Sequence, residues 1–228
     1  MIILGCAVFY IEWIVTVSLH EKLQFMRLIC SRMCHDLINS SSSIEFTMDL
    51  LDQSHINNES YLLSKQSINN LNTKLRLFRQ AFGFNTSNKS SYPKGLEDMI
   101  SQFFIDKDCT IIWKNKLPEE INSESIKAIC ILFIFIHSIA SNNLDIFIFS
   151  NVIENNYIGL ALEIKGNEIT IPENHKYIIE NDIEQISLDD ITPRNITTYI
   201  LMLSIHILGG HFEIEEGSVL RLSCMLPK

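Results

Sequence analysis

The feature that most constrains the fold is a narrow apolar stripe between residues 68 and 82. Its members recur at alternating intervals of three and four residues, and they are Ile68, Leu71, Leu75, Phe78 and Phe82. This spacing is typical of a helix that packs along a coiled-coil seam. The stripe ends at Gly83, a residue type that commonly terminates helices. We therefore predict a helix that buries one narrow face against other helices.

A second amphipathic helix is predicted just before it, over residues 23–51. Its apolar residues recur every three or four positions, with Ser40 filling one expected gap; they are Ile29, Met33, Leu37, Ile44, Met48 and Leu51. The polar stretch 52–60 separates the two helices, so they should form an antiparallel hairpin. One hairpin cannot cover both of its apolar faces. Pairing of two hairpins in a dimeric four-helix bundle solves this problem, and we predict residues 20–83 as the dimerisation hairpin of a homodimer.

The rest of the chain predicts a second domain of a different kind. Residues 84–95 lack apolar periodicity and contain Pro93 and Gly95, which indicates a linker. In residues 96–228, helical and strand patterns alternate. The fold class is therefore predicted as α+β, with the hairpin followed by an α/β sandwich that has helices on one face of a mixed sheet. We predict helices over 96–104, 123–140, 174–188 and 193–208, and strands over 109–114, 145–149, 157–165, 211–215 and 219–225.

Two helix starts are predicted from capping residues. Ser123 is a preferred residue type for the cap of helix 123–140. Thr192 followed by Pro193 gives a cap and a first helical position for the last helix, because proline has no N–H to leave unpaired there. Gly209 and Gly210 then end that helix.

Negative charge is concentrated in the C-terminal part of the chain. The 18 Lys and Arg residues stand against 27 Asp and Glu residues, for a net charge of -9, and residues 84–228 hold 11 of the basic and 20 of the acidic groups. Such a surface repels phosphate backbones and anionic lipids. Nucleic acid is therefore excluded as an expected partner, and so is a membrane surface for this half.

The N-terminal residues 1–19 are almost continuously apolar and just long enough for a marginal membrane span. Glu12 lies near their centre, where it would cost about 2.5 to 3.5 kcal/mol. Three interpretations stay open: a tether that keeps the rest of the chain cytoplasmic, an extension of the first helix, or sequence upstream of the true start. The six cysteines show no disulfide spacing, which predicts a reducing cytoplasm.

His35 is the predicted reactive residue. It lies two positions from both Met33 and Leu37, so it points about 200° away from each of these apolar positions and toward solvent. A solvent-facing imidazole followed by a carboxylate, Asp36, suits reversible phosphorylation, because one ring nitrogen can attack phosphorus while an acceptor holds the other. An ordinary surface histidine is the alternative. A zinc site at Cys30, Cys34 and His35 is disfavoured, because no second pair of ligands follows.

The residues around His35 resemble a known family. Residues 31–51 read SRMCHDLINSSSSIEFTMDLL, which resembles the phosphoacceptor helix of the ChpT-type histidine phosphotransferases of alphaproteobacterial phosphorelays. Residues 74–83 (KLRLFRQAFG) and 192–223 agree as well, so the similarity runs from about Leu23 to the end. The family has a proline shortly after its His-Asp-Leu, where this chain has Ser40.

This resemblance implies a dimeric phosphorelay intermediate in cell-cycle signalling. His35 would accept a phosphoryl group from the receiver aspartate of a hybrid histidine kinase and pass it to the receiver aspartates of response regulators. No cofactor or metal is expected on this chain, because Mg²⁺ would be bound in the partner receiver. The rival prediction is a dimeric adaptor that docks receivers without chemistry.

The C-terminal residues also resemble histidine-kinase ATPase domains. Residues 207–227 (ILGGHFEIEEGSVLRLSCMLP) look like the last helix and strands of such a domain. An active kinase would need an Asn for Mg²⁺ on helix 123–140, an Asp-x-Gly-x-Gly loop and a Gly-rich lid. The chain has none of these motifs. We therefore predict a degenerate ATPase-like domain that binds no nucleotide.

Several further residues are predicted around the acceptor helix. Ser31, Arg32 and Ser42 lie within two turns of His35, and with Arg76 and Arg79 they are candidate receiver-docking residues; a simply solvated face at Lys74, Arg76 and Arg79 is the alternative. Asp36 and Asn39 form an Asp-x-x-Asn sequence, which resembles the element that bifunctional histidine kinases use to position water for receiver dephosphorylation. A solvated Asn39 is the other interpretation. His137 and His206 lie on apolar helix faces and are predicted as core histidines, and His175 has no partner motif.

Overall fold

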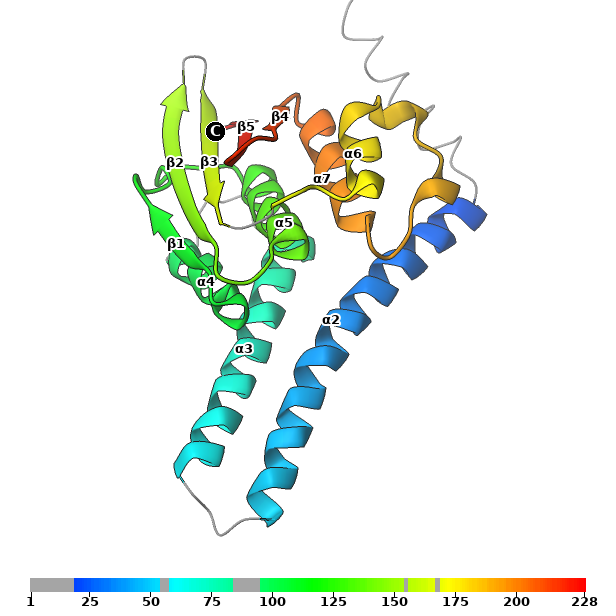
Figure 1. Cartoon of the computed structure of the whole chain (residues 1–228). Helices are drawn as coiled ribbons and strands as arrows, with labels where there is room; N and C mark the ends of the chain where they lie inside the picture. The colour runs from blue at the N-terminus through cyan, green and yellow to red at the C-terminus, as the bar shows by residue number, and fades with distance from the viewer. Residues whose placement is uncertain (1–18, 54–57, 84–94, 154–155, 167–168) are drawn as a thin grey trace, which may run out of the picture.

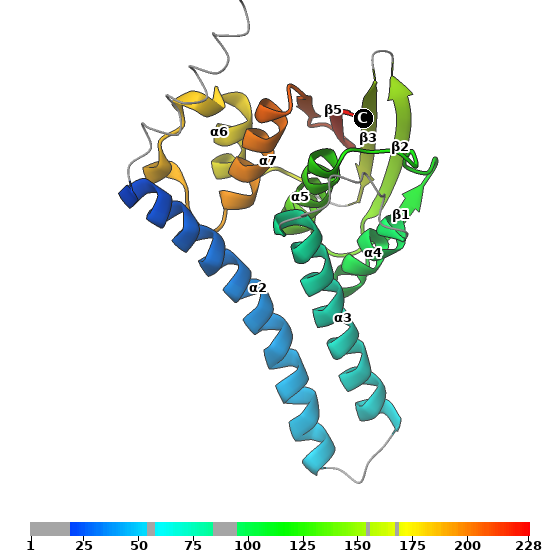
Figure 2. The same cartoon turned by 180° about the vertical axis from the view of Figure 1, so that it is seen from behind.

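Two long helices project from an α/β body in the computed structural model. The structure describes residues 19–53, 58–83, 95–153, 156–166 and 169–228. For some residues of the two long helices it describes the backbone but not the side chain. Helix α2 (Leu19–Gln53) and helix α3 (Asn58–Phe82) run antiparallel. They approach each other at their free ends and diverge toward the body, where α5 (Ser123–Ile139) and α7 (Ile196–Ile207) lie between them (Figures 1 and 2). The predicted hairpin is thus formed by α2 and α3.

The structure does not describe residues 1–18 or residues 84–94. The predictions for the N-terminal segment and for most of the linker therefore lie outside the described residues. Within the part of the chain that the structure describes, no helix is both long enough and apolar enough to cross a membrane.

The body contains a five-stranded mixed sheet. Its strands are β1 (Thr110–Trp113), β2 (Asp145–Ile153), β3 (Tyr157–Lys165), β4 (His211–Glu215) and β5 (Leu220–Pro227), in the spatial order β1-β2-β3-β5-β4. Strands β1 and β2 are parallel and are connected through α5, whereas the other neighbours are antiparallel. The mixed sheet predicted from the alternating patterns is therefore confirmed.

One face of the sheet is covered by helices and forms the core. Alternate residues of the central strands are buried, among them Ile146, Ile148, Leu160, Leu162 and Leu222. Helix α5 is buried along most of its length, which explains why its sequence is apolar on all sides. The opposite face carries charged residues such as Glu163, Lys165 and Arg221, so the body has two layers.

The long helices share their core with the body. Leu77, Phe78 and Ala81 of α3 are buried in the same cluster as the sheet and α5, and Met33 and Leu37 of α2 pack against it. Nearer the N-terminus of α2, a second cluster is contacted by Phe25, Leu28 and Ile29. This cluster is built by α6 (Glu173–Glu180), the segments after it, and α7. The N-terminal half of α2 therefore packs on the body through two apolar contacts.

The predicted single helix over 174–188 is wrong. Helix α6 ends at Glu180, and two short 3-10 helices follow it, η2 (Ile183–Gln185) and η3 (Leu188–Asp190). The side chains of Asp182 and Ser187 accept hydrogen bonds from the backbone N–H groups of Glu184 and Asp189. Such side-chain bonds offer the backbone an alternative to continued α-helix, so each begins a new short turn.

The two predicted helix starts are also corrected. Helix α5 is capped by Asn122 instead of Ser123, because the Asn122 Oδ1 accepts from the Ser125 N–H at 2.8 Å. Helix α7 begins at Ile196, three residues after Pro193, because the Asn195 Oδ1 accepts from both the N–H and the hydroxyl of Thr192 and holds a separate turn. Strand β2 extends beyond the predicted 145–149 because its partner β3 pairs with it along its whole length.

Strands β3 and β4 and the first helix of the body agree with the sequence patterns. Strand β3 has the predicted bounds 157–165, and β4 the predicted bounds 211–215. Helix α4 (Leu96–Phe103) ends one residue early, and the 3-10 helix η1 (Ile105–Lys107) follows it. Helices α4 and α5 both pack against α3 and join it to the body.

Candidate functional site

The backbone of His35 lies in the middle of α2, but its side chain is outside the described part of the structure. The predicted solvent-facing orientation therefore stays a prediction. Its helical neighbours Ser31, Asn39 and Ser42 are exposed. Asn39 begins the next helical turn after His35, and its backbone carbonyl accepts a hydrogen bond from the Ser43 hydroxyl at 3.2 Å.

Asp36 is directed toward the body by an ion pair with Arg32. The Arg32 Nε lies 3.1 Å from the Asp36 Oδ2, and the two side chains are only 21% and 20% exposed. Both line a small crevice of about 10 Å³ together with residues of α3, α5 and α7, among them Phe78, Ile134 and Thr197. The guanidinium of Arg32 thus contacts its own chain and fixes the orientation of Asp36. Its predicted role in receiver docking stays a prediction.

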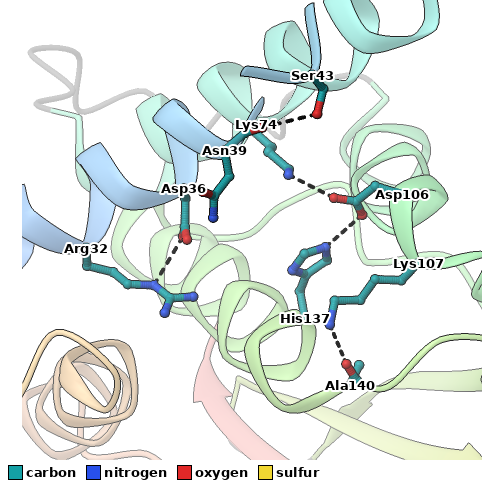
Figure 3. A network of polar contacts seen from close by, with 9 residues as sticks. All are labelled: Arg32, Asp36, Asn39, Ser43, Lys74, Asp106, Lys107, His137 and Ala140. Carbon is teal, nitrogen blue, oxygen red and sulfur yellow. Dashed lines mark hydrogen bonds and ion pairs between the residues drawn. The ribbon is translucent and has the colours of Figure 1, made fainter. Parts of the chain in front are cut away.

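A second polar network joins α3 to the body beside this ion pair (Figure 3). Asp106 of η1 lies at its centre. The Asp106 Oδ2 is 2.8 Å from the Lys74 Nζ of α3, and the Asp106 Oδ1 is 2.9 Å from the His137 Nε2 of α5. These three residues therefore connect the second hairpin helix to the buried helix of the body.

The charge states in this network follow from burial and pairing. Burial alone would raise the pKa of Asp106, but the contacts from His137 and Lys74 overcome this effect and lower the pKa to about 2. Burial lowers the pKa of His137, and Asp106 only partly offsets that. Because an ionised carboxylate can only accept, His137 donates its Nε2 hydrogen to Asp106. The ring of His137 is held between Phe103 and Phe104, at centroid distances of 4.4 Å and 5.3 Å.

Lys107 adds another cation next to this network. Its ammonium donates to the carbonyl of Ala140, which caps the end of α5, and its own carbonyl accepts from the Asn143 N–H at 3.0 Å. Burial lowers the pKa of Lys107, the negative Asp106 raises it, and the nearby Lys74 and Arg32 lower it further. Lys74 and Arg32 thus each lie within electrostatic range of Lys107.

The sequence patterns missed a buried histidine, His175 of α6. Its side chain is 5% exposed, and its Nδ1 lies 2.6 Å from the Thr198 hydroxyl of α7. Burial, with a smaller effect from Arg32, lowers the pKa of His175 to about 4. No local signal predicts this, because Thr198 is 23 residues away in the sequence. The neutral imidazole is therefore the form that the folded protein holds.

The core prediction for His206 is wrong, whereas His137 is mostly buried. His206 lies in the last turn of α7 on an exposed side and pairs with Glu184 at 3.1 Å. The apolar pattern of α7 placed it inside, but the helix packs only part of its surface on the core. The predicted docking residues Arg76 and Arg79 are exposed on α3 and border an open groove lined by apolar residues, including Met33, Leu75 and Phe82.

Within the described ranges, no group of three or more His, Cys, Asp or Glu side chains converges as a cation site would require. The side chains of Cys34 and His35, which the disfavoured zinc site would use, are not among those described.

Comparison with known proteins points to phosphotransferases. No family model matches the chain. The protein phosphotransferase ChpT of Brucella abortus (strain 2308) is 27% identical over 88 residues, which are 38% of this chain and 42% of that relative. The match thus spans less than half the length of the curated relative.

The solved structures agree at the level of the fold. A bacterial phosphotransferase determined at 1.7 Å superposes with a TM-score of 0.74 at 17% identity, over 92% of this chain and 98% of that one. A histidine kinase domain from the blue-light activated kinase of Erythrobacter litoralis EL346 gives a TM-score of 0.44 at 12% identity, over 82% and 95% of the two chains, which is too remote to support an argument. The chain therefore resembles ChpT in sequence and has the fold of a bacterial phosphotransferase.

Proposed function

We propose that the protein is a histidine phosphotransferase of a bacterial phosphorelay. The observation that supports this most is the His35-Asp36 sequence in the middle of α2, on a chain that shares its whole fold with a bacterial phosphotransferase. A nitrogen of His35 attacks the phosphorus of a receiver aspartyl phosphate, the N–P bond forms, and the P–O bond to the aspartate breaks. The leaving carboxylate stays on the receiver with its Mg²⁺.

Asp36 and Asn39 act beside the acceptor in this proposal. Asp36 stabilises the positive charge that develops on the imidazole, and the Arg32 ion pair at 3.1 Å keeps its carboxylate in one orientation. Asn39 is exposed one turn away and orients water toward a docked aspartyl phosphate when the receiver is dephosphorylated. Asp36 is thus assigned to transfer and Asn39 to the phosphatase reaction.

The partners are receiver domains in the cytoplasm. A hybrid kinase receiver donates the phosphoryl group, and response-regulator receivers accept it. The exposed residues Ser31, Ser42, Arg76 and Arg79 lie on the two helices that a receiver would approach. Because receivers present carboxylates around their reactive aspartate, the two arginines provide complementary charge for docking.

The test uses a purified receiver that carries labelled phosphate on its aspartate. The expected result is transfer of acid-labile label to this protein within minutes. Labelled ATP with Mg²⁺ should leave the protein unlabelled, since the phosphoryl donor is a receiver and no nucleotide binds. Stable receiver binding without any label would instead establish a non-catalytic adaptor, and label from ATP would establish a kinase.

In this proposal the protein is a homodimer, and the hairpins of its two chains pair into a four-helix bundle. Exposed apolar side chains on the hairpin support this, because α3 presents Tyr61, Ile68 and Leu75 at seven-residue intervals. Leu75 is 43% exposed in the single chain. A partner hairpin would cover this stripe.

Leu75→Asp should abolish the dimer without unfolding the chain. An unpaired carboxylate in an apolar interface costs several kcal/mol, which raises the dissociation constant at least about 100-fold. Sedimentation velocity should show monomer, while circular dichroism keeps the wild-type helical signal. Asn69→Asp is the matched control, because it adds the same charge to an exposed position outside the stripe. A Leu75→Asp dimer as stable as wild type would place the interface elsewhere.

A further inference from the structure

Four helices meet around the small crevice that Arg32 and Asp36 line. Its volume is about 10 Å³, and one buried water molecule needs about 10 to 15 Å³. Most of its walls are apolar; they are formed by Ile29 and Met33 of α2, Phe78 and Phe82 of α3, Ile134 of α5, and Ile196 and Ile200 of α7. The size of the crevice therefore limits a ligand to one water molecule or one small ion.

Thr197 supplies a buried hydroxyl to this crevice. The residue lies in the first turn of α7, is 3% exposed and lines the crevice. Among the contacts of the described residues, its hydroxyl takes part in no hydrogen bond. The next residue differs, because the Thr198 hydroxyl lies 2.6 Å from the His175 Nδ1. Since buried hydroxyls are almost always hydrogen-bonded, that of Thr197 indicates a partner in the crevice.

Arg32 brings a second polar group to the same place. Its Nε is buried and makes no hydrogen bond within the part of the chain that the structure describes. The Asp36 Oδ2 lies 3.1 Å from this nitrogen, but without the alignment of a hydrogen bond, so charge holds the pair together. The Nε–H group is therefore available to an acceptor in the crevice.

A water molecule would satisfy both groups at once. Its oxygen accepts from the Arg32 Nε–H, and it exchanges a further hydrogen bond with the Thr197 hydroxyl. Asp36 also lines the crevice and offers a carboxylate oxygen as a third acceptor site. Buried waters typically have about three such partners. Because the guanidinium and the carboxylate offset each other, the site favours a neutral ligand over an ion.

We propose that the crevice binds one water molecule between Arg32 and Thr197, and that Thr197 thereby positions the Arg32–Asp36 pair of the acceptor helix. The binding of water is independent of the proposed function. Its consequence for transfer rests on that function, in which Asp36 stabilises the charge that develops on the imidazole. Thr197 is a positioning residue, since it acts only through the water and Arg32.

The first test is a high-resolution crystal structure of the wild-type protein. Electron density for one water oxygen is expected within about 2.7 to 3.2 Å of both the Arg32 Nε and the Thr197 Oγ1. The same density should be present in Thr197→Ser, which keeps the hydroxyl. It should be absent in Thr197→Val, which keeps the shape of the side chain and removes the hydroxyl.

The second test measures transfer from a labelled receiver to the same variants. Thr197→Val should lower the maximal rate by about 10-fold with an unchanged KM, because the acceptor helix is less well positioned while receiver docking is intact. Thr197→Ser should keep the wild-type rate. Loss of packing would give the opposite order, since only serine lacks the methyl group. Thr110→Val, at an exposed position of β1, is the matched control and should leave the rate unchanged.

The outcomes separate this inference from the proposed function. A wild-type crystal structure without water in the crevice would overturn the inference. Transfer by Thr197→Val at the wild-type rate would overturn the positioning role of Thr197. If Thr197→Val does not fold, Thr197→Ala also lacks the hydroxyl and provides the same comparison. A wild-type protein that takes up no phosphoryl group would overturn the proposed function, while the water in its crystal structure would still support the binding site.

Discussion

Truncation of Phe78 to alanine is expected to lower the free energy of unfolding by about 3 to 5 kcal/mol. Its ring is 3% exposed and lies between Phe82 of α3 and Phe103 of α4, with centroid distances of 6.3 Å and 6.4 Å. The substitution leaves a cavity where the hairpin joins the body. Because both share one core, the loss should appear as a single earlier unfolding transition, not as separate unfolding of the hairpin.

Phe149→Ala is the matched control for this substitution. Phe149 lies on the outer face of β2 and is 36% exposed, so its loss should cost only about 1 kcal/mol. Urea unfolding at one protein concentration measures both values, which removes any difference from dimer dissociation. Equal costs for Phe78 and Phe149 would contradict the placement of α3 in the shared core.

Acidification below pH 6.5 is expected to destabilise the protein through His175. Its pKa in the folded state is about 4, against 6.5 for an unperturbed histidine. Between these values the unfolded chain binds one more proton than the folded one, so stability falls as the pH falls. The full contribution is present above pH 6.5 and is lost by about pH 4. The shift corresponds to about 3 kcal/mol.

Removal of this histidine should flatten the pH dependence. His175→Gln should be less stable than wild type at pH 7.5, because the contact with Thr198 changes, but its stability should decrease less between pH 6.5 and pH 4.5. The remaining slope comes from other groups, among them His137. Urea midpoints measured across this range would refute the assignment if His175→Gln and wild type lost stability in parallel.

The hairpin and the sheet could be predicted because their signals are local. The spacing of Ile68, Leu71 and Leu75 determines a helix with one apolar face, and alternation determines β3 to the residue. The errors lie where a single side chain redirects the backbone. Asp182, Ser187 and Asn195 bond to backbone groups nearby, and the sequence does not show whether such residues will end a helix or lie within it.

In the candidate site too, the contacts that follow from local sequence signals could be predicted, and those between distant residues could not. The His35-Asp36 pair was found from helical phase and resemblance, and the Arg32–Asp36 contact could have been inferred from its spacing of four residues. The contacts of Asp106 could not, because His137 is 31 residues away and approaches only when η1 packs on the end of α5. The contacts among Lys74, Asp106 and His137 therefore become visible only in the fold.

Identification of the labelled residue tests most directly whether His35 carries the phosphoryl group. A labelled receiver is mixed in parallel with wild type, His35→Gln and His206→Gln, in which an exposed histidine of α7 is replaced. Wild type and His206→Gln should take up acid-labile label to the same extent, and His35→Gln should take up none while retaining the wild-type circular dichroism spectrum. Label on folded His35→Gln protein equal to that of wild type would contradict the claim.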